Sequence, residues 1–238
     1  MVYGLVIAAG KQSRFETPLP KALMPVNEYT TLLDINFKNL QTVCDNVYVV
    51  CSVENELYFL SYPHITIKSG FGCGDAVMRA LEQLPLRNND TCFIQWGDSL
   101  HKESLYHLLK DSFKECMLIP CVEEDKPYVQ IITRGKYLCK AIFSKYGEET
   151  SKGYHDLSLF YGNAIEILTA LYKMQILFWN EVEYRHPHGN EMQFLDALGD
   201  VNLEAEILPV TDYKGIAFNT VEEYNSCINN VNCSDYIS

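Results

Sequence analysis

Residues 2–10 read Val-Tyr-Gly-Leu-Val-Ile-Ala-Ala-Gly, an apolar run with β-branched side chains that ends in Ala-Ala-Gly. Such a run bounded by glycine is typical of a buried strand, so we predict a strand over residues 2–8. Residues 9–28 then read as a loop with several prolines and basic side chains. The apolar run is too short to span a membrane and lacks the basic leader of a signal peptide, so we expect a cytoplasmic protein.

Helical and extended patterns alternate after this loop. From Thr31, apolar residues at 33, 37, 40 and 44 share one helical face. Further helices are predicted over 75–84, with Asp75 as the cap, and over 102–113. Strands are predicted over 47–51, 65–67, 91–96 and 117–122. This βαβ series predicts an α/β fold, a Rossmann-like mainly parallel sheet flanked by helices.

The pattern changes after Glu123. Strands over 129–133 and 137–143 form a predicted hairpin around Arg134-Gly-Lys136, and the polar segment 144–153 is expected to be mobile. The remaining predicted elements are helices over 163–179, 190–198 and 221–230, and strands over 205–210 and 215–218.

Composition excludes several classes of protein. The 19 Lys and Arg against 31 Asp and Glu leave a net charge of -12, which argues against a nucleic-acid partner because phosphate contacts need a basic face. The nine cysteines are scattered without a C-x-x-C spacing, so reduced thiols are expected rather than disulfides or a zinc site. The pair His186 and His188 has no third ligand nearby in sequence and indicates a loop.

Ligands of parallel α/β sheets bind beyond the carboxyl ends of the strands. The loop after the first strand reads Ala8-Ala-Gly-Lys-Gln-Ser-Arg14 and is followed by Pro20-Lys21. Glycine allows close approach of the backbone to a ligand, and the cations of such a loop can neutralise a triphosphate. On composition alone, a solvated basic loop is an equal alternative.

The stretch Val6-Ile-Ala-Ala-Gly-Lys-Gln-Ser-Arg-Phe, with Pro20-Lys21 after it, resembles the signature of the nucleotidyltransferase superfamily that makes nucleotide-diphosphate sugars and related activated metabolites. The sequence departs from that signature at Gln12, where a second glycine is usual. No G-K-[ST] occurs, so a Walker-type P-loop is excluded. The resemblance implies catalytic roles for Lys21, Arg14 and Lys11, and nucleotide binding at Ala8, Ala9 and Gly10.

The resemblance also implies a magnesium ion as cofactor. Asp98 follows a predicted strand, where a lone aspartate is otherwise more often a helix cap, and family members hold the metal at this position. Magnesium prefers one or two carboxylates or amides together with substrate phosphates. The usual second acid is replaced by Ala217, which leaves Asn219 as the expected second ligand, with Asp212 or Glu222 as alternatives.

Weaker resemblances to the same family concern the segments that bind the nucleotide base and the acceptor. The turn Gly70-Phe-Gly-Cys-Gly-Asp75 resembles an element that reads the nucleotide base, although a flexible turn is a comparable interpretation. The candidates for base contacts are Gly72, Gly74 and Asp75. The candidates for acceptor contacts are Lys145, Gly162 and Glu191, and surface charge is an even alternative for Lys145 and Glu191. Trp96, Trp179 and Tyr154 are expected to be packing residues.

The resemblance thus implies that an acceptor's phosphate attacks the α-phosphorus of a nucleoside triphosphate and releases pyrophosphate. No general base is needed, because a phosphate monoester is already anionic near neutral pH. We expect one domain over 1–238, with a nucleotide-binding part over 1–122 and an acceptor-binding part over 123–238. CTP and a small phosphorylated capsule or cell-surface building block, such as choline phosphate or an amino-acid-like phosphate, are the favoured partners.

Other functions remain open at the level of sequence. Hexose-1-phosphate uridylyl- or guanylyltransfer is the nearest alternative. The segment Asn219-Thr-Val-Glu-Glu also resembles molybdenum-cofactor guanylyltransferases, whereas Pro20-Lys21-Ala-Leu fits sugar-type members better. A glycosyltransferase of related fold would carry a D-x-D motif, which the sequence lacks. A non-catalytic nucleotide sensor is an alternative from another class, favoured by Ala217 and Gln12 and opposed by Asp98, Arg14 and Lys21.

Overall fold

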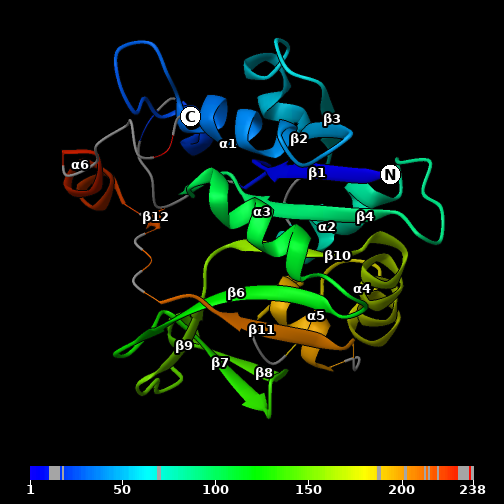
Figure 1. Cartoon of the computed structure of the whole chain (residues 1–238). Helices are drawn as coiled ribbons and strands as arrows, with labels where there is room; N and C mark the ends of the chain where they lie inside the picture. The colour runs from blue at the N-terminus through cyan, green and yellow to red at the C-terminus, as the bar shows by residue number, and fades with distance from the viewer. Residues whose placement is uncertain are drawn as a thin grey trace.

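A computed structural model describes residues 1–10, 17, 19–68, 71–186, 189–200, 203–211, 213, 215–218, 220–229 and 236. Its centre is β1 (Val2–Ile7), the strand predicted over 2–8, which lies between β2 (Asn46–Ser52) and β4 (Thr91–Trp96) in parallel register. With β3 (His64–Ile67) the order is β3-β2-β1-β4 (Figure 1). These four strands are all parallel, in agreement with the mainly parallel sheet that the sequence predicts. This parallel half confirms the predicted Rossmann-like α/β class.

Three helices follow strands of this half of the sheet, after β1, β3 and β4 in turn. They are α1 (Leu32–Gln41), α2 (Cys73–Leu81) and α3 (Glu103–Ser112), each within a few residues of its predicted span. α1 begins where Thr31 and Asp34 form a capping box, in which Thr31 Oγ1 accepts from Asp34 N at 3.2 Å and Asp34 Oδ2 accepts from Thr31 N at 2.7 Å. α2 begins differently: its N-cap is Gly72, with no side-chain cap, so the predicted cap at Asp75 is wrong.

The second half of the sheet is mostly antiparallel. Its strands are β6 (Met117–Glu124), β7 (Val129–Arg134), β8 (Tyr137–Phe143), β9 (Gly153–Asp156), β10 (Leu159–Asn163) and β11 (Ala205–Pro209). β10 runs antiparallel between β4 and β6, so all ten strands form one sheet that continues from the first half into the second. The predicted hairpin is present as β7 and β8. The segment predicted to be mobile begins with a 3₁₀ turn over Ser144–Tyr146, and β9, which the sequence pattern did not predict, starts at Gly153.

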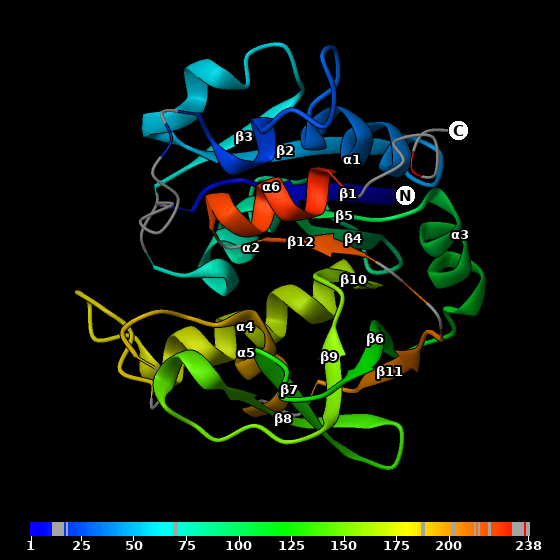
Figure 2. The same cartoon turned by 90° about the vertical axis from the view of Figure 1, so that its left-hand side faces the viewer.

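The remaining helices are α4 (Ala164–Phe178), α5 (Phe194–Asp200) and α6 (Val221–Asn229). A separate small sheet pairs β5 (Ser99–Leu100) with β12 (Ile216–Ala217), and α6 lies alongside it (Figure 2). α5 starts four residues later than predicted, because the segment before it runs along the start of α2 instead of coiling. Within the described ranges, no helix is both long and apolar enough to cross a membrane.

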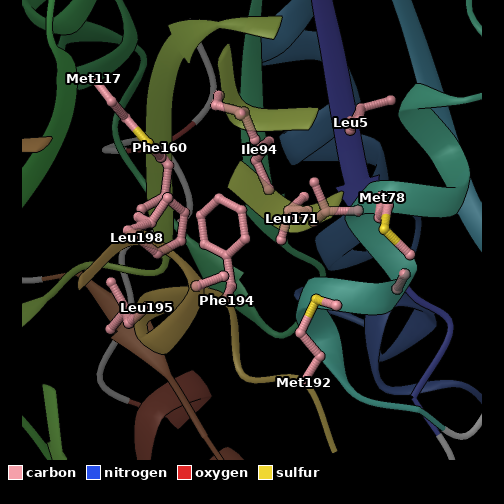
Figure 3. Packing of buried hydrophobic residues seen from close by; sticks show 14 of the residues in the cluster. Leu5, Met78, Ile94, Met117, Phe160, Leu171, Met192, Phe194, Leu195 and Leu198 are labelled. Atoms are coloured by element: carbon pink, nitrogen blue, oxygen red, sulfur yellow. The ribbon is translucent and has the colours of Figure 1, made fainter. Parts of the chain in front are cut away.

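Alternate residues of the central strands enter separate cores on the two faces of the sheet. Leu5 and Ile94 pack with α2, α4 and α5, whereas Val6 and Phe93 pack with α1 and α3. Burial on both faces explains why these strands are apolar throughout rather than alternating with polar residues. In the first core, the rings of Phe160 and Phe194 meet at 4.9 Å between their centroids, which fastens α5 to the sheet (Figure 3).

A close backbone contact joins the start of α2 to the segment before α5. Gly74 N donates to Met192 O at 2.9 Å, and Met192 N donates to Phe71 O at 2.8 Å. A Cβ atom at Gly72 would lie 2.8 Å from Met192 N, and Gly72 has a φ of +98°. Glycine is therefore required at position 72 by both its backbone conformation and the contact.

We predict that Gly72→Ala lowers the free energy of unfolding by about 1–3 kcal/mol, because alanine disfavours this backbone region and its methyl group would displace Met192. Gly10→Ala is the matched control, since a Cβ there has no heavy atom within 4 Å. Urea denaturation of both variants and the wild type measures the difference. Equal loss of stability in the two variants would contradict the role assigned to the contact.

Candidate nucleotidyl-transfer site

Lys21 and Asp98 meet at the carboxyl ends of β1 and β4. Lys21 begins a 3₁₀ turn (Lys21–Leu23), and its Nζ lies 3.4 Å from Asp98 Oδ2 and donates to Phe218 O, also at 3.4 Å. The Lys21 side chain is 13% exposed and that of Asp98 33% exposed. The contact thus places an ammonium and a carboxylate that ligands can reach where a parallel sheet binds ligands.

The turn that carries Asp98 is held from both sides. Gly97 N donates to Ile7 O at 2.9 Å, and a Cβ at Gly97 would lie 3.0 Å from Ala22 Cβ. Ser99 O accepts from the buried amides of Asn36 at 2.7 Å and Gln95 at 3.3 Å. The position of Asp98 is therefore set by β1, the Lys21 turn and α1 together.

The small β5–β12 sheet brings the end of the chain to the same place. Ser99 pairs with Ala217 in this sheet, so Phe218 follows directly beside the Asp98 turn. Phe218 is buried with Leu100, Ile216 and Tyr224, and the Tyr224 hydroxyl donates to Pro25 O. Asn219, the expected second metal ligand, lies outside the described residues, as do Lys11 and Arg14.

A cavity of about 190 Å³ opens next to this cluster and extends into the second half of the sheet. Asp98, Ala217 and Phe218 line this cavity, and so does Lys145. Two predicted site residues, Asp98 and Lys145, thus line one cavity. Its other lining residues are Cys73, Trp96, Tyr128, Val129, Phe143, His155, Asp156, Ser158, Gln193, Phe194 and Leu195.

The remaining nucleotide candidates are close to the site but mostly covered. Ala8 and Ala9 are buried at the end of β1, and Gly10 is exposed. The N–H of Gly74 is already paired with Met192 O. Asp75 is buried, accepts a hydrogen bond from the Tyr184 hydroxyl at 2.9 Å and lies 3.6 Å from Arg79 Nε. Burial raises the pKa of Asp75 despite these partners. Its observed contacts therefore join α2 to the segment around Tyr184.

The three residues predicted to contact the acceptor do not all lie together in the structure. Lys145 Nζ lies 4.7 Å from the centroid of the Tyr146 ring at the cavity wall. Glu191 is next to the cavity, since its Oε2 accepts from Gln193 Nε2 at 3.4 Å. Gly162 is elsewhere: it pairs with Cys92 near the start of β4, and a Cβ there would lie 3.0 Å from Met117 Cβ. The structure therefore brings Lys145 and Glu191 to the site but not Gly162.

Several cavity residues were not among the sequence candidates. Asp156 and Ser158 lie at the junction of β9 and β10, and Asp156 Oδ1 accepts from Ser158 N at 2.8 Å. The sequence offers one signal for Asp156, the polar pair His155-Asp156 before an apolar run. This pair is too short to produce a recognisable period of hydrophobicity. Trp96 packs against Phe160, as expected of a packing residue, and also lines the cavity.

The cysteines of the described chain are free thiols, as the sequence predicts. Burial raises the pKa of the cavity residue Cys73 to about 11, although Phe194 N donates to its sulfur. This thiol is therefore uncharged near neutral pH and unsuited to nucleophilic chemistry. The described residues contain no group of three or more His, Cys, Asp or Glu able to hold a metal ion.

Solved structures of nucleotidyltransferases share this fold at low sequence identity. HddC from Yersinia pseudotuberculosis, complexed with GMP-PN, matches with a TM-score of 0.68 and 14% identity over 96% of this chain and 99% of that one. The inositol-1-phosphate CTP transferase from T. maritima matches with a TM-score of 0.70 and 13% identity over 95% and 92% of the two chains. The CTP:phosphocholine cytidylyltransferase LicC from Streptococcus pneumoniae matches with a TM-score of 0.70 and 14% identity over 96% and 98%.

No curated protein matches the sequence significantly. The family model of the MobA-like NTP transferase domain matches residues 4–160, which span β1 to β10 and include both Lys21 and Asp98. This match covers more than half of the chain and confirms the resemblance to nucleotidyltransferases. The protein, a nucleotidyltransferase, therefore belongs to the MobA-like NTP transferase family.

Proposed function

We propose that this nucleotidyltransferase is magnesium-dependent and joins the nucleotide of CTP to a small phosphorylated metabolite, such as a capsule or cell-surface building block. The observation that carries the proposal is the contact of Lys21 with Asp98, a residue that lines the same cavity as Lys145. Lys21 and Lys145 provide positive charge at two positions, which suits a reaction between a nucleoside triphosphate and an acceptor phosphate. Since nucleoside triphosphates are made in the cytoplasm, we place the enzyme there.

In the proposed reaction, an oxygen of the acceptor phosphate forms a bond to the α-phosphorus of the triphosphate. The bond from that phosphorus to its bridging oxygen breaks, and pyrophosphate leaves with the electron pair. The nucleophile is already ionised, so the chain has to orient the two phosphates and neutralise their charge. Lys21 supplies a fixed ammonium for this purpose, and we propose that Lys11 and Arg14 supply further positive charge.

The oxygen donors around Asp98 suit a magnesium ion held largely by substrate. Asp98 offers a partly exposed carboxylate, and Ala217 beside it offers no side-chain oxygen. Magnesium accepts one or two protein carboxylates or amides together with phosphates and water, so Asp98 with Asn219 is a chemically sufficient set. When bound, the ion would neutralise the phosphates of the nucleotide.

The two parts of the chain have different proposed roles. Residues 1–122 supply Lys21 and Asp98, and we propose that they bind the nucleotide. Residues 123–238 supply Lys145 and most of the residues that line the cavity, and we propose that they bind the acceptor. They also return Phe218 to the first part, so we propose a single domain rather than two independent ones.

Cytidylyl transfer is supported by the likeness to two CTP-using enzymes. Hexose-1-phosphate uridylyl- or guanylyltransfer is the second candidate, because the fold is also similar to HddC complexed with GMP-PN and to a putative glucose-1-phosphate thymidylyltransferase from Bacillus anthracis. A non-catalytic sensor is opposed by Lys21 and Asp98, which lie together in reach of ligands.

We expect metal-dependent pyrophosphate release when the protein is given CTP, magnesium and a suitable phosphate monoester. Pyrophosphate release, measured for CTP, UTP, GTP, ATP and dTTP against a panel of phosphorylated metabolites with and without chelator, identifies both substrates. Preference for UTP or GTP with a hexose 1-phosphate would replace the cytidylyl assignment by the second candidate. Absence of pyrophosphate release with every pair of nucleotide and acceptor would favour the non-catalytic nucleotide sensor.

Lys21→Ala should lower turnover by about 10²–10³-fold while the fold is retained, because one fixed cation at the reacting phosphates is lost. Lys140→Ala is the control, since Lys140 is an exposed lysine on β8 that does not line the cavity. Steady-state pyrophosphate release gives the rates, and circular dichroism checks the fold. Near-normal turnover in a folded Lys21→Ala protein would overturn the role of Lys21.

A further inference from the structure

Asp156 is a second carboxylate among the residues that line the cavity. It ends β9, is 5% exposed and lines the cavity together with Asp98. Its Oδ1 accepts from Ser158 N at 2.8 Å. Among the described residues, no lysine, arginine or histidine forms an ion pair with it. A buried carboxylate therefore lines the cavity without an ion-pair partner in the part of the chain that the structure describes.

A carboxylate away from bulk water is stabilised by an opposite charge nearby, which the described residues do not place at Asp156. A ligand that brings a positive charge would provide that stabilisation. Lys145 also lines the cavity, but its Nζ lies 4.7 Å from the ring centroid of Tyr146 and 5.7 Å from that of Phe143, and no ion pair joins it to Asp156.

Aromatic rings form much of the remaining lining. Trp96, Tyr128, Phe143, Phe194 and Phe218 all border the cavity. The faces of aromatic rings attract cations, most strongly where water is excluded. The aromatic lining and Asp156 thus favour the same chemical group, a positively charged amine.

A polyol would find fewer partners in this cavity. Gln193 donates to Tyr146 Oη at 3.1 Å and its Oε1 accepts from Cys73 Sγ at 3.8 Å, so its amide is already engaged. The ring of His155 lies 2.9 Å from Glu124 Oε2 through Nδ1. Sugar hydroxyls need several free donors and acceptors, whereas an ammonium group needs a carboxylate and apolar surroundings.

We infer that the cavity selects an acceptor that carries a positively charged amine as well as its phosphate, with Asp156 as the counter-ion of the amine. This inference rests on the proposed nucleotidyl transfer and names the acceptor class for it. Lys145, which lines the same cavity, is then available to the phosphate of the acceptor. Such a zwitterionic acceptor matches the opposite charges that the cavity presents.

The test compares acceptors that differ in charge but little in shape. Phosphocholine and 3,3-dimethylbutyl phosphate have the same outline, and only the first carries a cation; phosphoethanolamine and glucose 1-phosphate complete the series. With the triphosphate that the wild type uses best, we expect kcat/KM for the cationic acceptors to exceed that for 3,3-dimethylbutyl phosphate by at least about tenfold. Equal values, or a preference for glucose 1-phosphate, would overturn the inference and leave the transferase assignment intact.

Asp156→Asn should abolish this preference. We expect kcat/KM for the cationic acceptors to fall by at least about tenfold and that for the neutral isostere to change little, because the variant loses charge and not volume. Glu123→Gln is the control, a change of the same charge at an exposed position on the adjacent strand β6. A uniform rise in the magnesium needed for half-maximal rate, whatever the acceptor, would assign Asp156 to metal binding and overturn its role as counter-ion.

Calorimetry separates this inference from the transferase assignment. Binding of phosphocholine and of 3,3-dimethylbutyl phosphate to the wild-type protein tests the cavity without turnover. If no nucleotide pair reacts but phosphocholine binds at least about tenfold more tightly than the isostere, the transferase proposal fails and the amine site stands. If Asp156→Asn does not fold, the wild-type binding ratio alone decides, and a ratio near one overturns the inference.

Discussion

The site depends on the turn at residues 97–99, which the backbone of β1 and two buried amides hold in place. Gly97 N donates to Ile7 O, and Ser99 O accepts from both Asn36 and Gln95. The Tyr106 hydroxyl in turn donates to Gln95 Oε1 at 2.7 Å. Buried amides are costly unless paired, so this network tolerates little displacement of the turn. Asp98, which lies between its two anchored ends, is consequently fixed without a buried side-chain contact of its own.

The same turn determines where the positive charge of the site lies. Gly97 permits close approach of Ala22, and Ala22 belongs to the 3₁₀ turn that begins with Lys21. The chain as a whole carries a net charge of -12, so its general field repels phosphates. Attraction must therefore be local, and Lys21 with an expected metal at Asp98 can provide it. An acidic surface with a cationic site disfavours polymeric phosphates and still admits a small nucleotide.

A backbone hydrogen bond attaches the proposed acceptor-binding part of the chain to the end of β4. Trp96 N, at the end of β4, donates to Ser158 O at 3.0 Å, and Ser158 adopts a φ of +58° at the connection between β9 and β10. The antiparallel insertion of β10 between β4 and β6 makes this contact possible. As a result Asp156, Trp96 and Asp98 border one cavity although they come from different parts of the sheet.

Short-range patterns were sufficient for the parallel half. Strand and helix periods from β1 to α3 lie within single segments, and the rule that parallel strands bind ligands at their carboxyl ends, together with the family resemblance, predicted that Lys21 and Asp98 belong to one site. The partners of Asp75 and Gly72 could not be predicted, because Tyr184 and Met192 lie more than a hundred residues away in the sequence. The role of Asp156 was hidden for the same reason: β9 is a four-residue strand, and its place in the cavity comes from pairing with β6 and β7. Periodicity reports which face of an element is buried, whereas the identity of the opposing residue follows from the packing of distant segments against one another.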